Sequence, residues 1–135
     1  MPRILVAALF VFVLTTVALA QDPVKVDGNH YKVEFENEQV RVLRIKVGPG
    51  EKSIMHQHPN AVAIFLTDVN GKFSFPDGTS QDVTSKAGEA RWTPEITHMP
   101  ENVGSQPFEV ILVELKGKAP APPSKKANHA ARTRR

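Results

Sequence analysis

Hydrophobic and polar residues alternate over short distances along the chain, and no segment of residues 21–116 carries a sustained apolar stripe with the helical period. Short runs rich in Val, Ile and Phe are instead divided by Gly, Pro and Asn, which is typical of an all-β sandwich or barrel. Asn70-Gly71 and Asp77-Gly78 are expected to form tight turns, because Gly tolerates a positive φ angle. The predicted strands are 30–36, 39–47, 61–67, 72–75, 81–84, 90–92 and 108–116.

The residues along these runs also predict which strands are buried and which are exposed. Residues 61–66 and 110–113 are continuously apolar, as expected of strands that are covered on both faces. Trp92 is expected in the core of the barrel. Arg41, Arg44 and Lys46 share one early strand and predict an exposed charged edge that deters pairing with another sheet. In the alternative interpretation, one of these three cations holds a substrate carboxylate.

The two ends of the chain differ from this body. Residues 1–20 join one Arg to an apolar run that ends in Ala18-Leu19-Ala20, the pattern of a secretory signal peptide cleaved after Ala20. An uncleaved membrane anchor is the alternative. Residues 117–135 are basic, rich in Pro and Ala, and predicted to be disordered. We therefore expect a signal peptide (1–20), a β-barrel domain (21–116) and a basic tail (117–135) in a periplasmic or secreted protein without a membrane span after cleavage.

Composition narrows the function classes. The 135 residues suit one domain, and the absence of Cys excludes disulfides and thiolate chemistry. The net charge of +3 conceals a split, because residues 21–116 carry ten basic and fourteen acidic residues whereas the tail carries six basic and no acidic ones. Basic and aromatic residues are not interleaved along the body, so nucleic-acid binding is not expected. The tail is either solvated or drawn to an anionic surface.

Three histidines supply the candidate chemistry. His56 and His58 lie two residues apart, so in an extended strand both side chains point to the same face. His98 follows after a Trp-Thr-Pro segment that is expected to return the chain across the barrel. Neutral imidazole is a common ligand of Fe, Mn, Ni, Cu and Zn. The spacing alone leaves a hydrogen-bonded structural pair open as well.

The surrounding residues resemble a known family. Gly50, five residues and His56-Gln57-His58 look like the first half of motif one of the cupins, which are small β-barrel (jelly-roll) proteins. The series Gly88, Pro94, His98 and Asn102 looks like their second motif. The resemblance covers roughly residues 40–115, and, more narrowly, residues 30–116 look like the small single-domain cupins of the β-alanine-degradation type. It implies a metal site at His56, His58 and His98, and it makes a homodimer that pairs through strand edges one expectation.

Departures from the family pattern shape the function hypotheses. The positions of the usual Glu ligand hold Val62 and Ala63, and His98 comes one residue early, leaving Met99 at the family position. A three-histidine site brings no negative charge to a divalent metal, which favours an anionic small-molecule ligand. Glu101 could supply the missing carboxylate, although an exposed loop position is the simpler expectation. Asn102 is expected to brace its loop.

Two functions of different kinds remain open at this point. The first is an exported metalloenzyme of small molecules, dioxygenase-like or isomerase-like, whose catalytic residues the sequence does not identify. The second is a non-catalytic cupin that binds small molecules or partners and has a decayed metal site.

Overall fold

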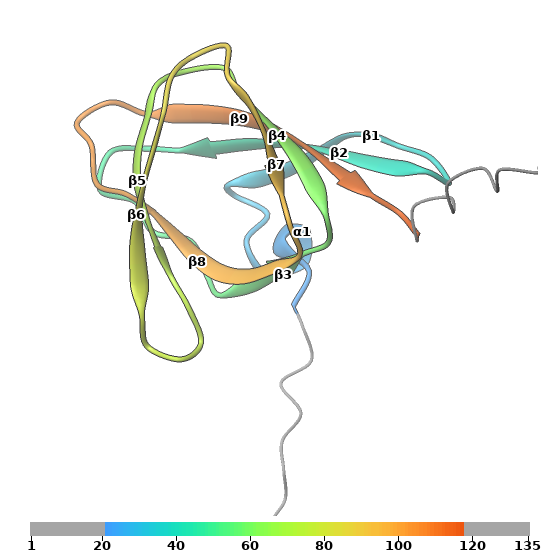
Figure 1. Ribbon diagram of the computed structural model, residues 1–135, viewed down its shortest axis with the longest axis horizontal. Helices are drawn as coiled ribbons and strands as arrows, with labels where there is room; N and C mark the ends of the chain where they lie inside the picture. The colour runs from blue at the N-terminus through green and yellow to red at the C-terminus, as the bar shows by residue number, and fades with distance from the viewer. Residues whose placement is uncertain (1–20, 118–135) are drawn as a thin grey trace, which may run out of the picture.

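The structure, a computed structural model, describes residues 21–117 (Figure 1). The predicted signal peptide (1–20) and nearly all of the predicted tail (118–135) lie outside the described residues. None of the described helices is long and apolar enough to cross a membrane. The elements are α1 (Pro23–Val26), β1 (Tyr31–Glu36), β2 (Val40–Val47), β3 (His56–His58), β4 (Ala61–Phe65), β5 (Val69–Ser74), β6 (Ser80–Ser85), β7 (Ala90–Thr93), β8 (Ile96–Asn102) and β9 (Phe108–Leu115).

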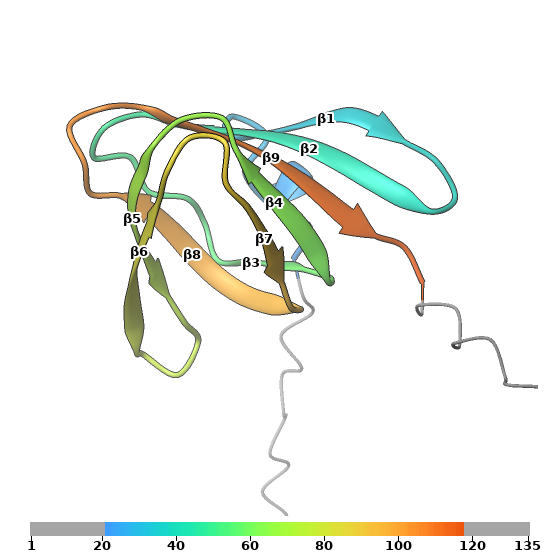
Figure 2. The ribbon, with the colours of Figure 1, turned by 45° about the horizontal axis from the view of Figure 1, so that its top comes forward.

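The strands form two antiparallel sheets, which confirms the predicted all-β class. One sheet has the order β1-β2-β9-β4-β7, and the other has the order β3-β8-β5-β6. In Figure 2, β1, β2 and β9 lie in the upper layer, and β3, β6 and β8 lie below them. Most neighbours in these sheets are distant in sequence, so long-range pairing closes the jelly roll.

The core lies between the two sheets and follows the two-residue period of the strands. On β9 the inward series is Phe108, Val110 and Leu112, and all three side chains are buried. The same series continues to Glu114, which is 1% exposed. The core is therefore apolar along most of β9 and becomes polar at the end of the strand. The other buried apolar residues are Tyr31, Leu43, Ile45, Val47, Ala61, Ala63, Phe65 and Val69.

One of the two predicted Gly turns is wrong. Gly78 has a φ of 84° and lies in the turn between β5 and β6, as expected from Asp77-Gly78. Asn70-Gly71, however, lies inside β5, where both residues pair with β6. A Cβ atom on Gly71 would lie 3.1 Å from the backbone oxygen of Glu101 on β8. Gly71 therefore permits a close approach between two strands and makes no turn.

Three predictions about exposure are also wrong. Strand β2, which holds Arg41, Arg44 and Lys46, lies between β1 and β9 and is not an edge. Arg44 instead pairs with Glu34 and Glu109. The outward side chains of β4 and β9 are only half-buried, so the described residues cover one face of these strands fully and the other in part. Trp92 is 58% exposed, because it lies opposite Val62 on the outward face of the edge strand β7.

Candidate metal centre

Strands β3 and β8 bring the three candidate histidines together. His56 and His58 share the inward face of β3, and Gln57 between them points the other way and donates to Glu95 at 2.9 Å. In the antiparallel pair of β3 and β8, His98 lies directly opposite His56. The register places His98 on the inward face even though it comes one residue earlier than in the family motif. All three side chains are buried, at 1%, 2% and 5% exposure.

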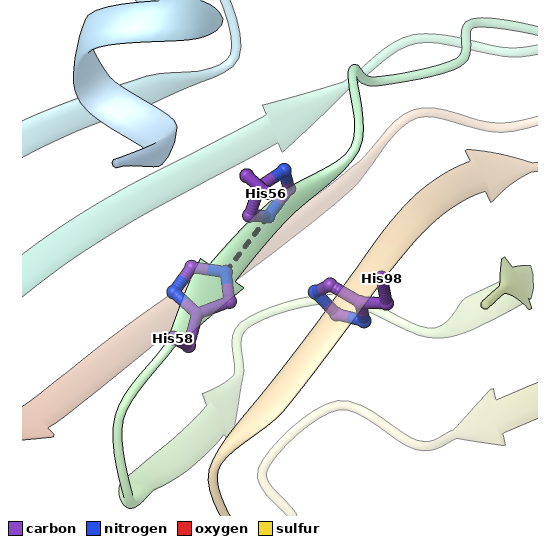
Figure 3. A group of neighbouring side chains, drawn as sticks. All are labelled: His56, His58 and His98. Atoms are coloured by element: carbon purple, nitrogen blue, oxygen red, sulfur yellow. Dashed lines mark hydrogen bonds between the residues drawn. The ribbon is translucent and has the colours of Figure 1, made fainter. Parts of the chain in front are cut away.

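The rings converge on one small region (Figure 3). Each offers a nitrogen atom, and these three atoms lie within 4.8 Å of one another. The Nε2 atoms of His56 and His58 are 2.9 Å apart. Imidazole nitrogens bind Zn²⁺ at about 2.0–2.1 Å, so nitrogens that share one ion lie within about 4.2 Å of each other, and the three rings are close to that arrangement.

Neighbouring oxygens assign the proton on two of the rings. The Nδ1 atom of His56 lies 2.6 Å from the carbonyl oxygen of Ile54, and the Nδ1 atom of His58 lies 2.6 Å from Oε1 of Glu114. A carbonyl and a carboxylate only accept hydrogen bonds, so both Nδ1 atoms must donate. In their neutral forms, both rings then present a bare Nε2 lone pair to the other across 2.9 Å. Two lone pairs this close require a proton or a metal cation between them.

His98 has the least satisfied ring of the three. Both of its ring nitrogens are buried, and neither has a hydrogen-bond partner among the described residues. Burial, reinforced by the nearby His58 and His56, lowers the pKa of His98 to about 2. Burial and the neighbouring His58 likewise lower the pKa of His56 to about 4. Both rings are therefore neutral near pH 7 and have lone pairs for a metal ion.

Glu114 is the component that the sequence analysis missed. It lies opposite Arg41 on one side and Ala61 on the other, and its two oxygens accept from His58 and from Nε of Arg41, each at 2.6 Å. Burial alone would raise the pKa of this carboxyl, but the bonds to His58 and Arg41 outweigh it and lower the pKa. Arg41 in turn donates to Asp22 at 2.6 Å. The available signal was the two-residue period of β9, which places one acidic residue in an otherwise apolar inward series.

Two other residues of β8, Glu101 and Asn102, have different roles. Glu101 does not supply the missing carboxylate. It lies on the opposite face of β8 from His98, and it pairs with Lys52 at 3.5 Å. Asn102 braces the following loop, as expected. Its amide donates to the carbonyl oxygens of Val47 and Gln106 at 3.0 and 2.8 Å, and its oxygen accepts from the backbone of Gly104 at 2.9 Å.

A cavity of about 400 Å³ opens beside the cluster, and His58 and His98 form part of its wall. Aromatic side chains from both sheets, Phe65, Phe73 and Phe108, form other parts of the wall. A second depression of about 420 Å³ lies near Asp68 and Lys86 and contains none of the three histidines. The cavity beside the cluster is therefore the one where a small molecule could meet a metal ion held by the histidines.

Comparison with known proteins supports the fold. No family model and no curated protein matches the chain. A solved cupin domain of Bordetella pertussis Tohama I is similar with a TM-score of 0.60 and 25% identity, over 64% of this chain and 92% of that one. An RmlC-like cupin protein with a double-stranded β-helix fold from Methanocaldococcus jannaschii is similar with a TM-score of 0.52 and 18% identity, over 64% of this chain and 78% of that one. The protein has the cupin fold. Both names describe that fold, so any function of this protein must be argued from its site.

Proposed function

We propose that this cupin holds one divalent first-row metal ion, of Fe, Mn, Ni, Cu or Zn, through His56, His58 and His98, and that the loaded site acts on a small anionic or chelating molecule. The observation that carries the proposal is the 2.9 Å contact between two Nε2 atoms whose rings both use Nδ1 as a donor. A bound cation would resolve this contact and would also give the buried ring of His98 a partner.

The charge around the cluster supports an anionic ligand. The three imidazoles are ligands without negative charge, and the nearest carboxylate, Glu114, lies one hydrogen bond beyond His58. Glu114 also shares its charge with Arg41, which pairs with Asp22. These three outer groups sum to a single negative charge, which offsets only part of a divalent cation. A bound metal ion would supply Lewis-acid polarisation of a carbonyl, enolate or carboxylate oxygen, or a place for dioxygen or water.

The residues of the chain would position and shield this chemistry. The carbonyl oxygen of Ile54 and the carboxylate of Glu114 hold two of the rings by their outer nitrogens. The ring of Tyr31 stands edge-on to His56, with centroids 4.7 Å apart, and that of Phe73 stands edge-on to His98 at 4.3 Å. These aromatic walls would limit the access of water to the metal side of the cluster.

Metal content tests the proposal. We expect wild-type protein, freed of metal with a chelator and then given Co²⁺ or Zn²⁺, to retain one ion per chain after gel filtration. His56→Ala and His98→Leu should lose it, whereas His30→Gln, a histidine substitution outside the cluster, should retain it. Wild-type protein that binds none of the five metals at micromolar concentration would contradict the proposal and would favour a decayed site. Retention in the cluster variants equal to wild type would also contradict it.

We also propose that the chain is exported and cleaved after Ala20. Supporting this, the first residue after that position already belongs to the fold, because the carbonyl oxygen of Gln21 accepts from the backbone N–H of Gln57 at 2.9 Å. Sequencing the N-terminus of protein from each cell fraction tests this, with Gln21 expected first in the periplasm or medium. A cytosolic protein that begins at Met1 would contradict it.

A further inference from the structure

The cavity beside the histidines is apolar over most of its wall. His58 and His98 are its polar groups at the proposed metal site, and Gln81, Thr93 and Arg91 are polar residues elsewhere in the wall. Away from them, both sheets contribute apolar side chains, and the cavity is partly enclosed rather than open like a surface groove. The apolar part of the wall includes Ala63, Phe65, Phe73, Val83, Phe108 and Leu112.

The charged residues of the wall are already engaged. The guanidinium of Arg91 lies 5.4 Å from the centroid of the Phe65 ring, donates to the carbonyl oxygen of Thr84 at 2.9 Å and pairs with Glu89 at 2.5 Å. Glu101 pairs with Lys52. The charge of Arg91 is thus already balanced by Glu89 and that of Glu101 by Lys52, so a second charged group on a ligand would meet no unbalanced charge in the wall. Burying such a group without a partner is unfavourable, so the wall selects against it.

An aromatic ring of the cavity wall lies next to His98, where the body of a ligand bound at the histidines would enter the cavity. Phe73 meets His98 edge-on, at an angle of 76° between the ring planes. Offset and edge-to-face contacts with such rings favour an aromatic partner over an equally large polar one. A volume of about 400 Å³ is within the range of pockets that enclose small organic ligands.

We infer that the ligand of this cavity has a single metal-chelating headgroup, which faces His58 and His98, and a ring-sized apolar body, aromatic or branched aliphatic, which occupies the rest. This inference rests on the proposed function, because the headgroup needs a metal ion at the histidines. It excludes small dicarboxylates and other ligands that are charged at both ends. The apolar wall thus determines the class of ligand, and the histidines determine the headgroup.

A pair of probes with the same headgroup tests the inference. Acetohydroxamate and benzohydroxamate both chelate through the hydroxamate, and they differ in a methyl against a phenyl group. With cobalt-loaded protein we expect benzohydroxamate to bind at least tenfold more tightly, because burial of the phenyl ring removes apolar surface from water. Cobalt binding is measured first in the same sample. Failure to bind either cobalt or any of the five proposed metals would overturn the proposed function, whereas cobalt binding with equal affinity for the two hydroxamates would overturn only this inference.

Filling the cavity locates the bound ring. Ala63 is a buried residue of the wall, and Ala63→Phe should reduce the preference for benzohydroxamate to less than threefold in cobalt-loaded protein. Ala90→Phe is the matched control, because Ala90 is exposed on the neighbouring strand β7, and it should retain the tenfold preference. Val83→Phe on the opposite sheet provides a second filling variant if Ala63→Phe does not fold. A full preference in a folded, filled variant would show that the ring binds elsewhere and would overturn the inference.

Discussion

His58 and Glu114 form a buried pair across 56 positions of sequence. The Nδ1 atom of His58 donates to Oε1 of Glu114 at 2.6 Å, and each side chain is only 2% exposed. Arg41 donates to the other carboxylate oxygen at 2.6 Å. A carboxylate on the outer nitrogen of a metal-binding imidazole fixes the orientation of the ring and increases its basicity. Glu114 should therefore tune the proposed site without contacting the metal.

Glu114→Gln should weaken both metal binding and the fold. The amide oxygen can still accept from His58, but the negative charge is lost and Arg41 keeps only Asp22 as an ionic partner. We expect metal affinity to fall about 10–100-fold, as for other outer partners of metal ligands. The free energy of unfolding should fall by about 2 kcal/mol, because the bond from Arg41 loses its charged acceptor. Competition titration with a chromophoric chelator and urea denaturation measure the two effects.

Glu109→Gln is the control for this variant. Glu109 is on the same strand and pairs with Arg44 and Lys46, but it is partly exposed and points outward. Metal affinity should not change, and stability should change by about 0.5 kcal/mol or less. If the two variants weaken metal binding equally, the effect belongs to the general charge of the strand, and the assigned role of Glu114 is wrong.

His98→Leu should stabilise the metal-free protein while abolishing metal binding. The two ring nitrogens of His98 are buried without partners among the described residues, and Leu has no polar atom to leave unsatisfied. We expect the free energy of unfolding to rise by about 1–2 kcal/mol, measured by urea denaturation with a chelator present. A gain in stability together with a loss of metal is the expected signature of a residue kept for function.

His56→Leu provides the contrast, because its ring donates to the carbonyl oxygen of Ile54 at 2.6 Å. This variant should lose metal binding and also lose stability, by about 1 kcal/mol. If His98→Leu is the less stable of the two metal-free variants, His98 contributes to the fold in a way that its missing hydrogen bonds do not indicate.

The sequence predicted the local part of the site and missed the long-range part. His56 and His58 were expected on one face because strand side chains alternate, and this requires no knowledge of the fold. Which residue lies opposite His56 depends on the register of β3 and β8, which is set by the whole barrel. Glu114 joins the cluster through the separate pairing of β9 with β2 and β4. From the sequence alone, only the inward direction of the Glu114 side chain could have been predicted, from the two-residue period of β9.

The distinction between local and long-range interactions also explains which turns and strands were predicted wrongly. The turn at Gly78 forms locally, so the sequence predicted it correctly. At Gly71 the local preference for a turn is overridden by pairing on both sides, with β6 and with β8. Strand β8 was not predicted because Pro100 interrupts its polar and apolar pattern. Pro100 nevertheless occupies an inward position opposite Phe73.

Asn102→Ala should destabilise the loop that follows β8. The side chain is 1% exposed and makes three hydrogen bonds to the backbone, at Val47, Gln106 and Gly104. Their loss leaves buried backbone groups unsatisfied, and we expect the free energy of unfolding to fall by about 2–3 kcal/mol. Asn70→Ala is the control, because that side chain is exposed, and it should cost about 0.5 kcal/mol or less. Equal effects in urea denaturation would contradict the bracing role of Asn102.

His30→Gln should destabilise the protein more at low pH than at high pH. The two ring nitrogens of His30 lie 2.8 Å from a carboxylate oxygen of Asp27 and 3.0 Å from one of Glu51, so both donate when the ring is protonated. Burial alone would lower the pKa of His30, but these two carboxylates outweigh it and raise the pKa above 6.5. The resulting stabilisation is fully present below the unfolded pKa, and it is lost as the pH rises through the raised folded value.

Urea denaturation of metal-free protein at about pH 5.5 and about pH 9 measures this difference, because the first value lies below the ordinary pKa of a histidine and the second lies well above it. Asp27 remains ionised at both, since Ser53 and His30 lower the pKa of its carboxyl despite the opposing effect of burial. The loss of stability caused by His30→Gln should therefore be larger at the lower pH. Lys86→Gln removes the exposed pair with Asp68 and should have a small effect that is the same at both pH values. A loss for His30→Gln that is constant, or that grows as the pH rises, would mean that His30 is neutral in the folded protein and that the two carboxylates do not hold its proton.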